Sequence, residues 1–470
     1  MKNKLSTKTK ILATLGPASS SVSMITKLIK TGVNGFRINF SHGELKDRIQ
    51  IYKNIKSAEE KSGKRVFIVQ DLCGPKIRLG ILDKAIFLHR GQEFLFENNE
   101  KCSENAIPLP LGPDFSLISE KEHFFINDGI VEVKVKKRLS KNRLLVKVIK
   151  GGVISSHKGV NFPSQEFSFS ALTKKDRKDV EFNIKYPVDY IALSFVRHEK
   201  DIIELRKVMK KHSLDIPVIA KIEKIGAIER IENIIQTADA IMVARGDLAV
   251  EAGFSSIGIL QKDIIRKSIA GEKPVIVATQ MLESMIENSV PTRAEITDIT
   301  NAVIDGADTL MLSAETAVGN DPPLVIKTMK NIIYKAEDYN SSQSIIIKNS
   351  ENIYDVVSDM AVEASDHLKT SIIVTPTISG TTAKKVASRR PNCFILALTP
   401  NEKISRKLLI YRAIFSDTLD YYSNTDEMIK LVEEKLEKIS NIKKGECYIM
   451  TAGIPTGKKG STNLIRIETL

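Results

Sequence analysis

The sequence predicts an α/β protein: a (β/α)8 barrel, interrupted by a small β-barrel lid domain and followed by an open α/β domain. Apolar strand-like runs alternate with amphipathic helix-like stretches, as in a parallel barrel. Between residues 75 and 163 this alternation gives way to short period-2 runs separated by turns. The chain of 470 residues also exceeds the roughly 100–200 residues of one ordinary domain.

Eight strand-like runs make up the predicted barrel, three before the β-rich segment and five after it. These runs are residues 10–16, 34–41, 65–72, 190–196, 217–223, 240–247, 274–281 and 309–316. Helix-like stretches separate them, for example residues 23–31, 45–62, 199–212 and 226–236. Eight such units are the number in a (β/α)8 barrel. We therefore expect the barrel to comprise residues 1–74 and 163–338.

The two other units have signals of their own. Asn127-Asp-Gly129 lies between alternating runs and predicts a hairpin in a lid domain of residues 75–162. A polar run at residues 338–344 reads as a linker. Beyond it we expect a C-terminal α/β domain of residues 345–470. Its predicted elements are a helix at 353–368 and strands at 371–377, 393–399 and 447–453.

Composition limits the class of protein. A hydrophobic content of 42% supports a globular core. Neither a secretory signal nor a membrane-spanning run is recognisable, so we expect a cytoplasmic protein without a membrane partner. The four cysteines are scattered and read as reduced thiols. The net charge of +13 allows a nucleic-acid partner, but lysines are spread along many segments without a nucleic-acid-binding motif, so we expect none.

The most informative feature is the run Pro217-Val-Ile-Ala-Lys-Ile-Glu223. Residues two apart in a strand point to the same side, so Lys221 and Glu223 leave one buried strand together. The next strand-like run ends at Asp247, and the one after it carries Thr279. Because the carboxyl ends of barrel strands form one face, these groups are expected to share a site.

Polar residues recur at this end of most predicted strands. They are Arg37, Asn39, Ser41, Asp71, Lys221, Glu223, Arg245, Gly246, Asp247, Thr279, Ser313 and Glu315. Each has a structural alternative: a rim ion pair for Arg37, mutual neutralisation for Lys221 and Glu223, and a helix cap for Asp247. Thr279 and Ser313 could bond nearby backbone. Together, so many buried charges favour a functional crevice, because burying them is costly.

These groups suit phosphoryl transfer. Glu223 and Asp247 can share a hard divalent cation, Mg²⁺ or Mn²⁺. Arg37 offers a planar fork for a phosphoryl group. Lys221 is a point charge suited to negative charge that develops during transfer. Gly246 lets backbone N–H groups approach a carboxylate at a helix start.

Ten stretches in order resemble the pyruvate kinase family. They include Arg37-Ile-Asn-Phe-Ser-His-Gly43, Gly74-Pro-Lys-Ile-Arg78, Lys158-Gly-Val-Asn161, Lys221-Ile-Glu223, Met242-Val-Ala-Arg-Gly-Asp-Leu248 and Leu312-Ser-Ala-Glu-Thr316. The resemblance covers nearly the whole chain. It implies transfer of a phosphoryl group between phosphoenolpyruvate and ADP/ATP. A Mg²⁺-dependent, enolate-forming lyase on a related barrel remains an alternative, which would need neither a lid nor nucleotide contacts.

The resemblance implies a role for each matching position. Arg37 would bind the phosphoryl group, Lys221 would stabilise the transition state, and Glu223 and Asp247 would hold Mg²⁺. Gly246, Asp247 and Thr279 would seat the substrate carboxylate, and Ser313 would relay a proton. The implied nucleotide contacts are Asn39, Phe40, Ser41, His42, Arg78 and Lys158.

One departure from the family concerns potassium. Asn39, Ser41, Asp71 and Leu72 match the monovalent-cation position, with leucine where many members have threonine. Lys76 stands where they have a glutamate that accompanies a potassium requirement. We predict that the Lys76 ammonium replaces the ion, which places the chain in a bacterial, potassium-independent subgroup. The alternative is that Lys76 points to solvent.

Regulation is predicted only in outline. Thr377, Ser379, Gly380, Thr381 and Thr382 precede a basic helix and resemble the loop where family members bind a phosphorylated sugar; an ordinary capped turn is the alternative. Residues 451–463 lack the Walker spacing and read as a structural or effector loop. The resemblance also implies a homotetramer.

Overall fold

The computed structural model describes residues 7–99, 106–110, 112–163, 170–340, 352–438, 445–454 and 462–470. Within these ranges, eight parallel strands close into a barrel in the order β1-β16-β15-β14-β13-β12-β3-β2. The barrel strands are β1 (Lys10–Thr14), β2 (Gly35–Asn39), β3 (Phe67–Asp71), β12 (Tyr190–Leu193), β13 (Val218–Ile222), β14 (Ala240–Ala244), β15 (Val275–Ala278) and β16 (Thr309–Leu312). All eight predicted strand runs are confirmed, and each observed strand is shorter than its predicted run.

Helices cover the outer face of the barrel, and side chains such as Leu12, Phe67 and Met242 fill its interior. Seven of the eight strands are therefore buried along their whole length. The helices are α1 (Val22–Thr31), α2 (Leu45–Ser62), α3 (Lys174–Val180), α4 (Phe182–Lys185), α5 (Glu199–Lys211), α6 (Ile225–Glu229), α7 (Ile231–Thr237), α8 (Arg245–Ala252), α9 (Ile257–Ala270), α10 (Arg293–Ile304), α11 (Ala314–Ala317) and α12 (Pro322–Asn340). Short 3-10 turns lie at η1 (Phe115–Leu117) and η2 (Glu283–Ile286).

The inserted unit is all-β, as predicted. It contains a six-stranded sheet in the order β11-β7-β8-β9-β5-β6 and a two-stranded sheet of β10 and β4. Its strands are β4 (Ile86–Leu88), β5 (Glu93–Glu97), β6 (Ala106–Pro108), β7 (His123–Ile126), β8 (Val131–Ser140), β9 (Arg143–Lys150), β10 (Gly152–Ile154) and β11 (Val160–Asn161). The predicted hairpin joins β7 to β8, and Asn127 and Asp128 take the positive φ values, 56° and 54°, that such a tight turn requires.

The C-terminal unit is an open sheet in the order β19-β18-β17-β20-β21, parallel except for the antiparallel pair β20–β21. Its elements are α13 (Ile353–His367), β17 (Ile372–Pro376), α14 (Thr381–Ser388), β18 (Phe394–Thr399), α15 (Glu402–Leu408), β19 (Ile414–Thr418), α16 (Thr425–Glu437), β20 (Cys447–Gly453) and β21 (Thr462–Thr469). The three predicted strands are present; β19 and β21 were not predicted. Of the predicted 451–463 loop, residues 455–461 lie outside the described ranges, as do residues 341–344 of the predicted linker.

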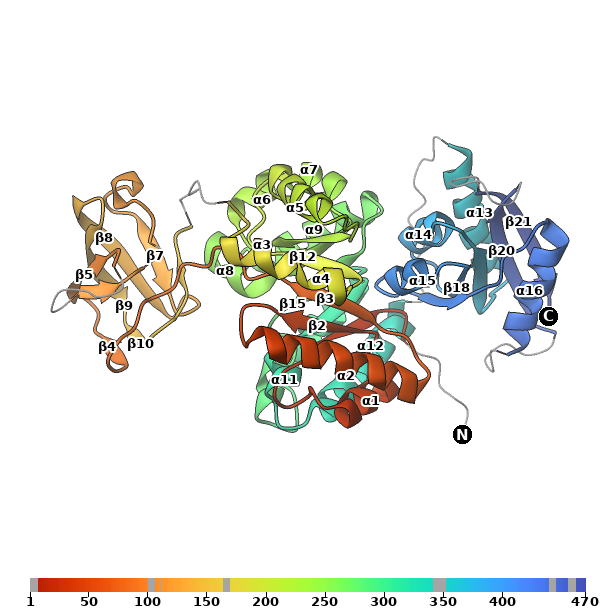
Figure 1. Ribbon diagram of the computed structural model, residues 1–470, viewed down its shortest axis with the longest axis horizontal. Helices are drawn as coiled ribbons and strands as arrows, with labels where there is room; N and C mark the ends of the chain where they lie inside the picture. The colour runs from red at the N-terminus through yellow and green to blue at the C-terminus, as the bar shows by residue number, and fades with distance from the viewer. Residues whose placement is uncertain are drawn as a thin grey trace.

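The barrel lies between the two other units (Figure 1). The inserted unit begins where β3 ends, at the carboxyl ends of the strands. Asp176 fixes the backbone that leads from β3 into this unit. Its Oδ1 accepts hydrogen bonds from the backbone N–H groups of Cys73 and Gly74. The C-terminal unit packs on the opposite end: Thr309, the first residue of β16, donates its hydroxyl to Ile410 O at 2.8 Å. The two ends of the barrel therefore meet different partners.

Candidate active site

Strand β13 delivers a lysine and a glutamate to the carboxyl end of the barrel. Lys221 is its penultimate residue, and Glu223 follows directly after it. Lys221 Nζ lies 3.1 Å from Glu223 Oε1. Both residues are buried, so the predicted pair exists and is largely removed from water. Ion pairs with so little exposure are held firmly when their remaining hydrogen-bond groups are satisfied.

A second carboxylate extends this pair into a chain of charges. Asp71, the last residue of β3, places Oδ1 3.2 Å from Lys221 Nζ. Its Oδ2 accepts a 2.6 Å hydrogen bond from Nε of Arg37, which lies on the neighbouring β2. Lys221 also donates to Ser194 Oγ at 2.7 Å. Alternating charges therefore join Arg37, Asp71, Lys221 and Glu223 across the mouth of the barrel.

The protonation tendencies follow from these contacts. Burial alone would lower the pKa of Lys221, but the carboxylates of Asp71 and Glu223 raise it above its ordinary value. Burial alone would raise the pKa of Asp71, but Lys221 and Arg37 lower it. Burial raises the pKa of Glu223 against the opposing Lys221, and the charge of Asp247 raises it further. Lys221 is therefore a cation, and Glu223 and Asp247 are close enough to repel each other.

Asp247 lies not in a strand but in the first turn of α8, because β14 ends at Ala244. The Lys76 ammonium lies 2.9 Å from Asp247 Oδ1. Burial alone would raise the pKa of Asp247, but Lys76 lowers it. The buried carboxylate of Glu223 and the half-buried carboxylate of Asp247, on neighbouring units, fit a hard divalent cation that takes its other oxygens from water and substrate. No cluster of three or more His, Cys, Asp or Glu residues forms within the described ranges.

The predicted monovalent-cation residues lie around the end of β2 and β3. Asn39 Oδ1 accepts a hydrogen bond from the backbone N–H of Ser41 at 3.0 Å. Leu72 is buried, and its carbonyl accepts from Ser194 Oγ at 2.7 Å. In the described part of the chain, the charged contact of Lys76 is with Asp247 and not with these residues. Lys76 does not point to open solvent, and the potassium independence stays a prediction.

Gly246 and Thr279 lie together beside Asp247. The backbone N–H of Gly246 donates to Thr279 Oγ1 at 2.9 Å. Thr279 has a φ of 70°, a strained conformation for a β-branched residue. Arg245 supports this turn, since its Nη2 donates to the carbonyls of Thr279 and Gln280 at 2.5 and 3.1 Å. Backbone strain of this kind is typical of functional sites.

Ser313 follows β16 at the same end of the barrel. Its backbone N–H donates to Glu315 Oε2 at 2.6 Å, and Glu315 Oε1 accepts from the backbone of Leu282 at 3.2 Å. Glu315 therefore braces two loops. Among the described residues, no hydrogen bond joins the Ser313 hydroxyl to Lys221 or Glu223, so its predicted role rests on position alone.

The predicted nucleotide contacts fall into two groups. The first is the loop after β2, where Arg48 donates to the carbonyls of Phe40 and His42 at 3.0 and 3.1 Å. Burial lowers the pKa of His42, and neighbouring arginines lower it further. The second group lies in the inserted unit, where Arg78 Nη1 donates to His157 O at 2.9 Å beside the exposed Lys158.

The inserted unit also touches the barrel near α8. Glu251 of α8 accepts hydrogen bonds from Lys224 at 2.6 Å and from Asn161 of β11 at 3.3 Å. Together with the Lys76–Asp247 pair, this contact links the inserted unit to the helix that carries Asp247. Neither Ser194 nor Glu251 was singled out from the sequence. Ser194 could have been found, because it lies within the predicted strand run 190–196, directly after the last residue of β12.

The predicted effector residues form a compact turn at the start of α14. Thr377 Oγ1 accepts from the backbone N–H of Gly380 at 3.0 Å, and the hydroxyls of Ser379 and Thr381 lie 2.9 Å apart. Thr382 Oγ1 lies 2.7 Å from Thr462 Oγ1 on β21. Gly380 has a φ of 82°, which favours glycine.

Comparison with known families agrees with this geometry. The family described as "Pyruvate kinase, barrel domain" matches residues 6–326, and "Pyruvate kinase, alpha/beta domain" matches residues 355–468. The chain belongs to the pyruvate kinase family. It is therefore a phosphotransferase with pyruvate kinase function. The predicted fold is confirmed as the pyruvate kinase fold.

Individual pyruvate kinases are similar along their whole length. The pyruvate kinase of Thermotoga maritima is 40% identical over 462 residues, which cover 98% of both chains. That of Geobacillus stearothermophilus is 36% identical, covering 98% of this chain and 80% of the relative. That of Corynebacterium glutamicum is 38% identical and covers 98% of both chains. Among the described helices, none combines the length and apolar character needed to span a bilayer.

Proposed function

We propose that the chain transfers the phosphoryl group of phosphoenolpyruvate to ADP, giving pyruvate and ATP, at the carboxyl end of the barrel. The observation that carries this proposal is the Lys221 ammonium, held 3.2 and 3.1 Å from the carboxylates of Asp71 and Glu223. A cation held in advance where negative charge develops needs no reorganisation during the reaction. In this family context the reaction serves glycolysis in the cytoplasm.

Each residue has a proposed part in the transfer. Arg37 binds the phosphoryl group with the guanidinium nitrogens that Asp71 does not occupy. The bond from phosphorus to the enol oxygen breaks as a bond to the β-phosphate oxygen of ADP forms, and Lys221 offsets the charge on the moving group. The enolate left behind takes up a proton at carbon to give pyruvate, with Ser313 proposed as the relay.

The substrate carboxylate would lie against Gly246, Asp247 and Thr279. The start of α8 favours an anion there through its N–H groups and dipole. Glu223 and Asp247 would hold Mg²⁺ or Mn²⁺, which supplies positive charge for the phosphoryl oxygens when bound. Since Lys76 contacts Asp247 Oδ1, Asp247 would pair with this lysine as well as hold the ion.

The nucleotide would lie between the loop of residues 39–42 and the inserted unit. We propose residues 1–74 and 163–338 as the catalytic domain, residues 75–162 as the lid, and residues 345–470 as the regulatory domain. Arg78 and Lys158 would contact the nucleotide when the lid excludes water. The chain would act as a homotetramer, with a sugar-phosphate effector at residues 377–382, no nucleic-acid partner, and no potassium requirement.

Measuring pyruvate and ATP together tests the proposal. With phosphoenolpyruvate, ADP and Mg²⁺, the two products should form in equal amounts, and omitting ADP should stop both. Pyruvate formed without ADP, or without matching ATP, would instead favour the enolate-forming lyase. We expect both reactions to need Lys221, so replacing this lysine would not tell them apart. The requirement for ADP is the result that does.

A further inference from the structure

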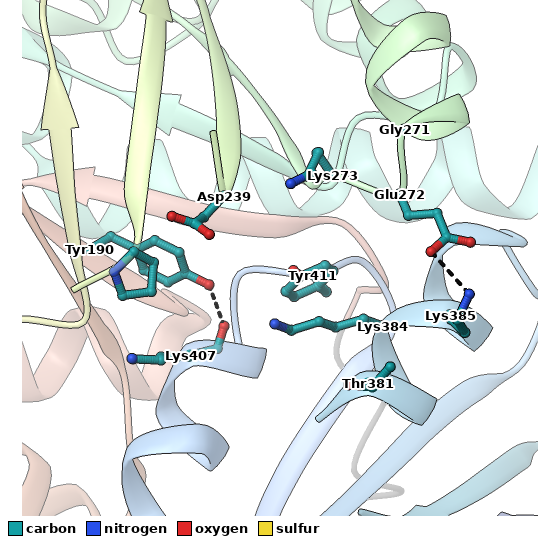
Figure 2. Close-up of a pocket in the computed structure, with 11 residues that line it drawn as sticks. Tyr190, Asp239, Gly271, Glu272, Lys273, Thr381, Lys384, Lys385, Lys407 and Tyr411 are labelled. Carbon is teal, nitrogen blue, oxygen red and sulfur yellow. Dashed lines mark hydrogen bonds and ion pairs between the residues drawn. The ribbon is translucent and has the colours of Figure 1, made fainter. Parts of the chain in front are cut away.

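A cavity of about 240 Å³ lies at the amino end of the barrel strands, against the C-terminal unit. Figure 2 shows its lining. The barrel contributes residues at the amino ends of its strands: Tyr190 begins β12, Asp239 precedes β14, and Lys273 precedes β15. The C-terminal unit contributes Lys384 of α14 and Lys407 of α15. The cavity is therefore at the opposite end of the strands from Lys221.

Positive charge exceeds negative charge in this cavity. Four lysines line it, at positions 273, 384, 385 and 407, against two carboxylates, Asp239 and Glu272. Both carboxylates are already engaged. Asp239 Oδ2 pairs with Arg206 at 2.6 Å, and Glu272 pairs with Arg389 at 2.8 Å and with Lys385 at 3.4 Å. The charge of Asp239 still acts on Lys384 and Lys273, but the lysines of the lining outnumber its carboxylates.

Lys384 is the clearest uncompensated cation. Among the described residues, its ammonium has neither an ion pair nor a hydrogen bond, and its nearest recorded partner is the Tyr411 ring, 5.8 Å away. Burial lowers the pKa of Lys384; Asp239 opposes this, whereas Lys407 and Lys273 lower the pKa further. A half-buried ammonium without a direct ion pair is costly, and a bound anion would lower that cost.

The cavity leaves room beside these ammonium groups. Tyr190 is fixed in the wall, since its hydroxyl donates to Lys407 O at 2.6 Å, and the Tyr411 ring adds apolar surface. A volume of about 240 Å³ is slightly below the roughly 300 Å³ at which drug-sized ligand pockets begin. A compact ligand therefore fits better than a dinucleotide or a polymer.

We propose that this cavity binds a small phosphate monoester, with the phosphate between Lys384 and Lys407 and the carbon skeleton against Tyr411. A phosphate dianion matches two ammonium groups in charge, and lysines bind phosphate as point charges. Such a ligand would bridge the barrel and the C-terminal unit. Of the loop residues 377–382 only Thr381 lines the cavity, so the cavity adjoins that loop and its other lining residues lie outside it.

Isothermal titration of the full-length protein tests this site without relying on catalysis, so Mg²⁺ and phosphoenolpyruvate are left out. The probes are inorganic phosphate, glycerol 3-phosphate and glucose 6-phosphate, with glycerol and glucose as uncharged controls. At least one phosphate probe should bind the parent protein. The double variant Lys384→Gln/Lys407→Gln should bind it at least about tenfold more weakly, since two charge-assisted hydrogen bonds to the phosphate are lost.

Matched variants separate this site from other phosphate sites. Lys403→Gln removes an exposed lysine from the same helix as Lys407 and should bind like the parent. Lys384→Arg keeps the charge and should retain binding. Thermal melting of each variant verifies folding. Tighter binding of the esters than of phosphate would identify a metabolite site, and equal binding a site for free phosphate. No binding by the parent, or equal binding by the parent and the double variant, would overturn the proposal.

Discussion

The two ends of the barrel collect charge in opposite ways. At the carboxyl end, Arg37 and Lys221 both form ion pairs with the buried carboxylate of Asp71, and Lys76 forms an ion pair with Asp247. At the amino end, Lys384 forms no ion pair with a carboxylate among the described residues. Lys10 is buried, and its ammonium donates a hydrogen bond to the backbone carbonyl of Ile414. Paired cations are held in place before substrate arrives. Unpaired cations can bind a ligand, and without one they lower the stability of the folded protein. The predictions below test this contrast.

A large effect on both stability and activity is expected from Asp71→Asn, because this carboxylate contacts both cations at the carboxyl end. Removing one partner of a buried ion pair typically costs about 3–5 kcal/mol of stability, and misplacing the cations should lower kcat by about 10²-fold. Urea unfolding and initial rates measure the two effects. The control is Asp83→Asn, at an exposed position of the inserted unit. Parent-like kcat in Asp71→Asn would contradict the proposed positioning role.

A smaller effect is expected from Asp247→Asn, which removes one of two proposed ligands of the divalent ion. Because amide oxygen is a weaker ligand than carboxylate, the Mg²⁺ concentration for half-maximal activity should rise at least about tenfold. Direct Mn²⁺ titration by electron paramagnetic resonance gives the same comparison without turnover. Unchanged Mn²⁺ affinity would remove Asp247 from the site. Chelation of divalent ions should abolish activity in the parent protein.

Lys10 predicts a pH dependence of stability from the amino end. Burial lowers its pKa from 10.5 to about 7 in the folded protein, where Nζ donates to Ile414 O at 2.7 Å. Between these two values the unfolded chain binds more protons, so unfolding free energy should rise with pH, by up to about 1.4 kcal/mol per unit. Below pH 7 Lys10 is protonated in both the folded and the unfolded chain, so it adds no further pH dependence to the unfolding free energy. Urea unfolding from pH 6 to 10 should show a shallower rise in Lys10→Met than in the parent.

The smallest effect is expected from potassium. If Lys76 supplies the positive charge of a monovalent ion, adding potassium at constant ionic strength should change kcat less than about twofold. Lys76→Glu should introduce a stimulation by potassium that sodium does not reproduce. Strong potassium stimulation of the parent would contradict this prediction.

Most of the barrel could be predicted, because apolar runs and strand ends are local features of the sequence. The pair Lys221 and Glu223 follows from strand alternation alone. The Lys76–Asp247 contact could not be predicted, since it joins positions 171 residues apart through the placement of the inserted unit. The run 240–247 was predicted too long because α8 begins at Arg245, whose guanidinium is held by carbonyls after β15.

The missed strands of the C-terminal unit have a similar cause. β19 lies at one edge of its sheet and is mostly only half-buried, so its sequence lacks a continuous apolar run. β21 is the antiparallel edge strand at the other side and is likewise largely exposed or half-buried. Edge strands carry weak sequence patterns because one side faces solvent. The lysine-rich cavity also escaped prediction, because its residues come from strands, helices and loops that are far apart in the sequence of two units.

The most direct test compares ATP formation from phosphoenolpyruvate and ADP in Lys221→Met and Lys384→Gln, one lysine from each end of the barrel. We predict that Lys221→Met lowers kcat by about 10²–10³-fold, the cost of removing one preorganised charge at the reacting centre. Lys384→Gln should stay within about twofold of the parent when neither glycerol 3-phosphate nor glucose 6-phosphate is added. A Lys221→Met protein with parent-like kcat would contradict the account.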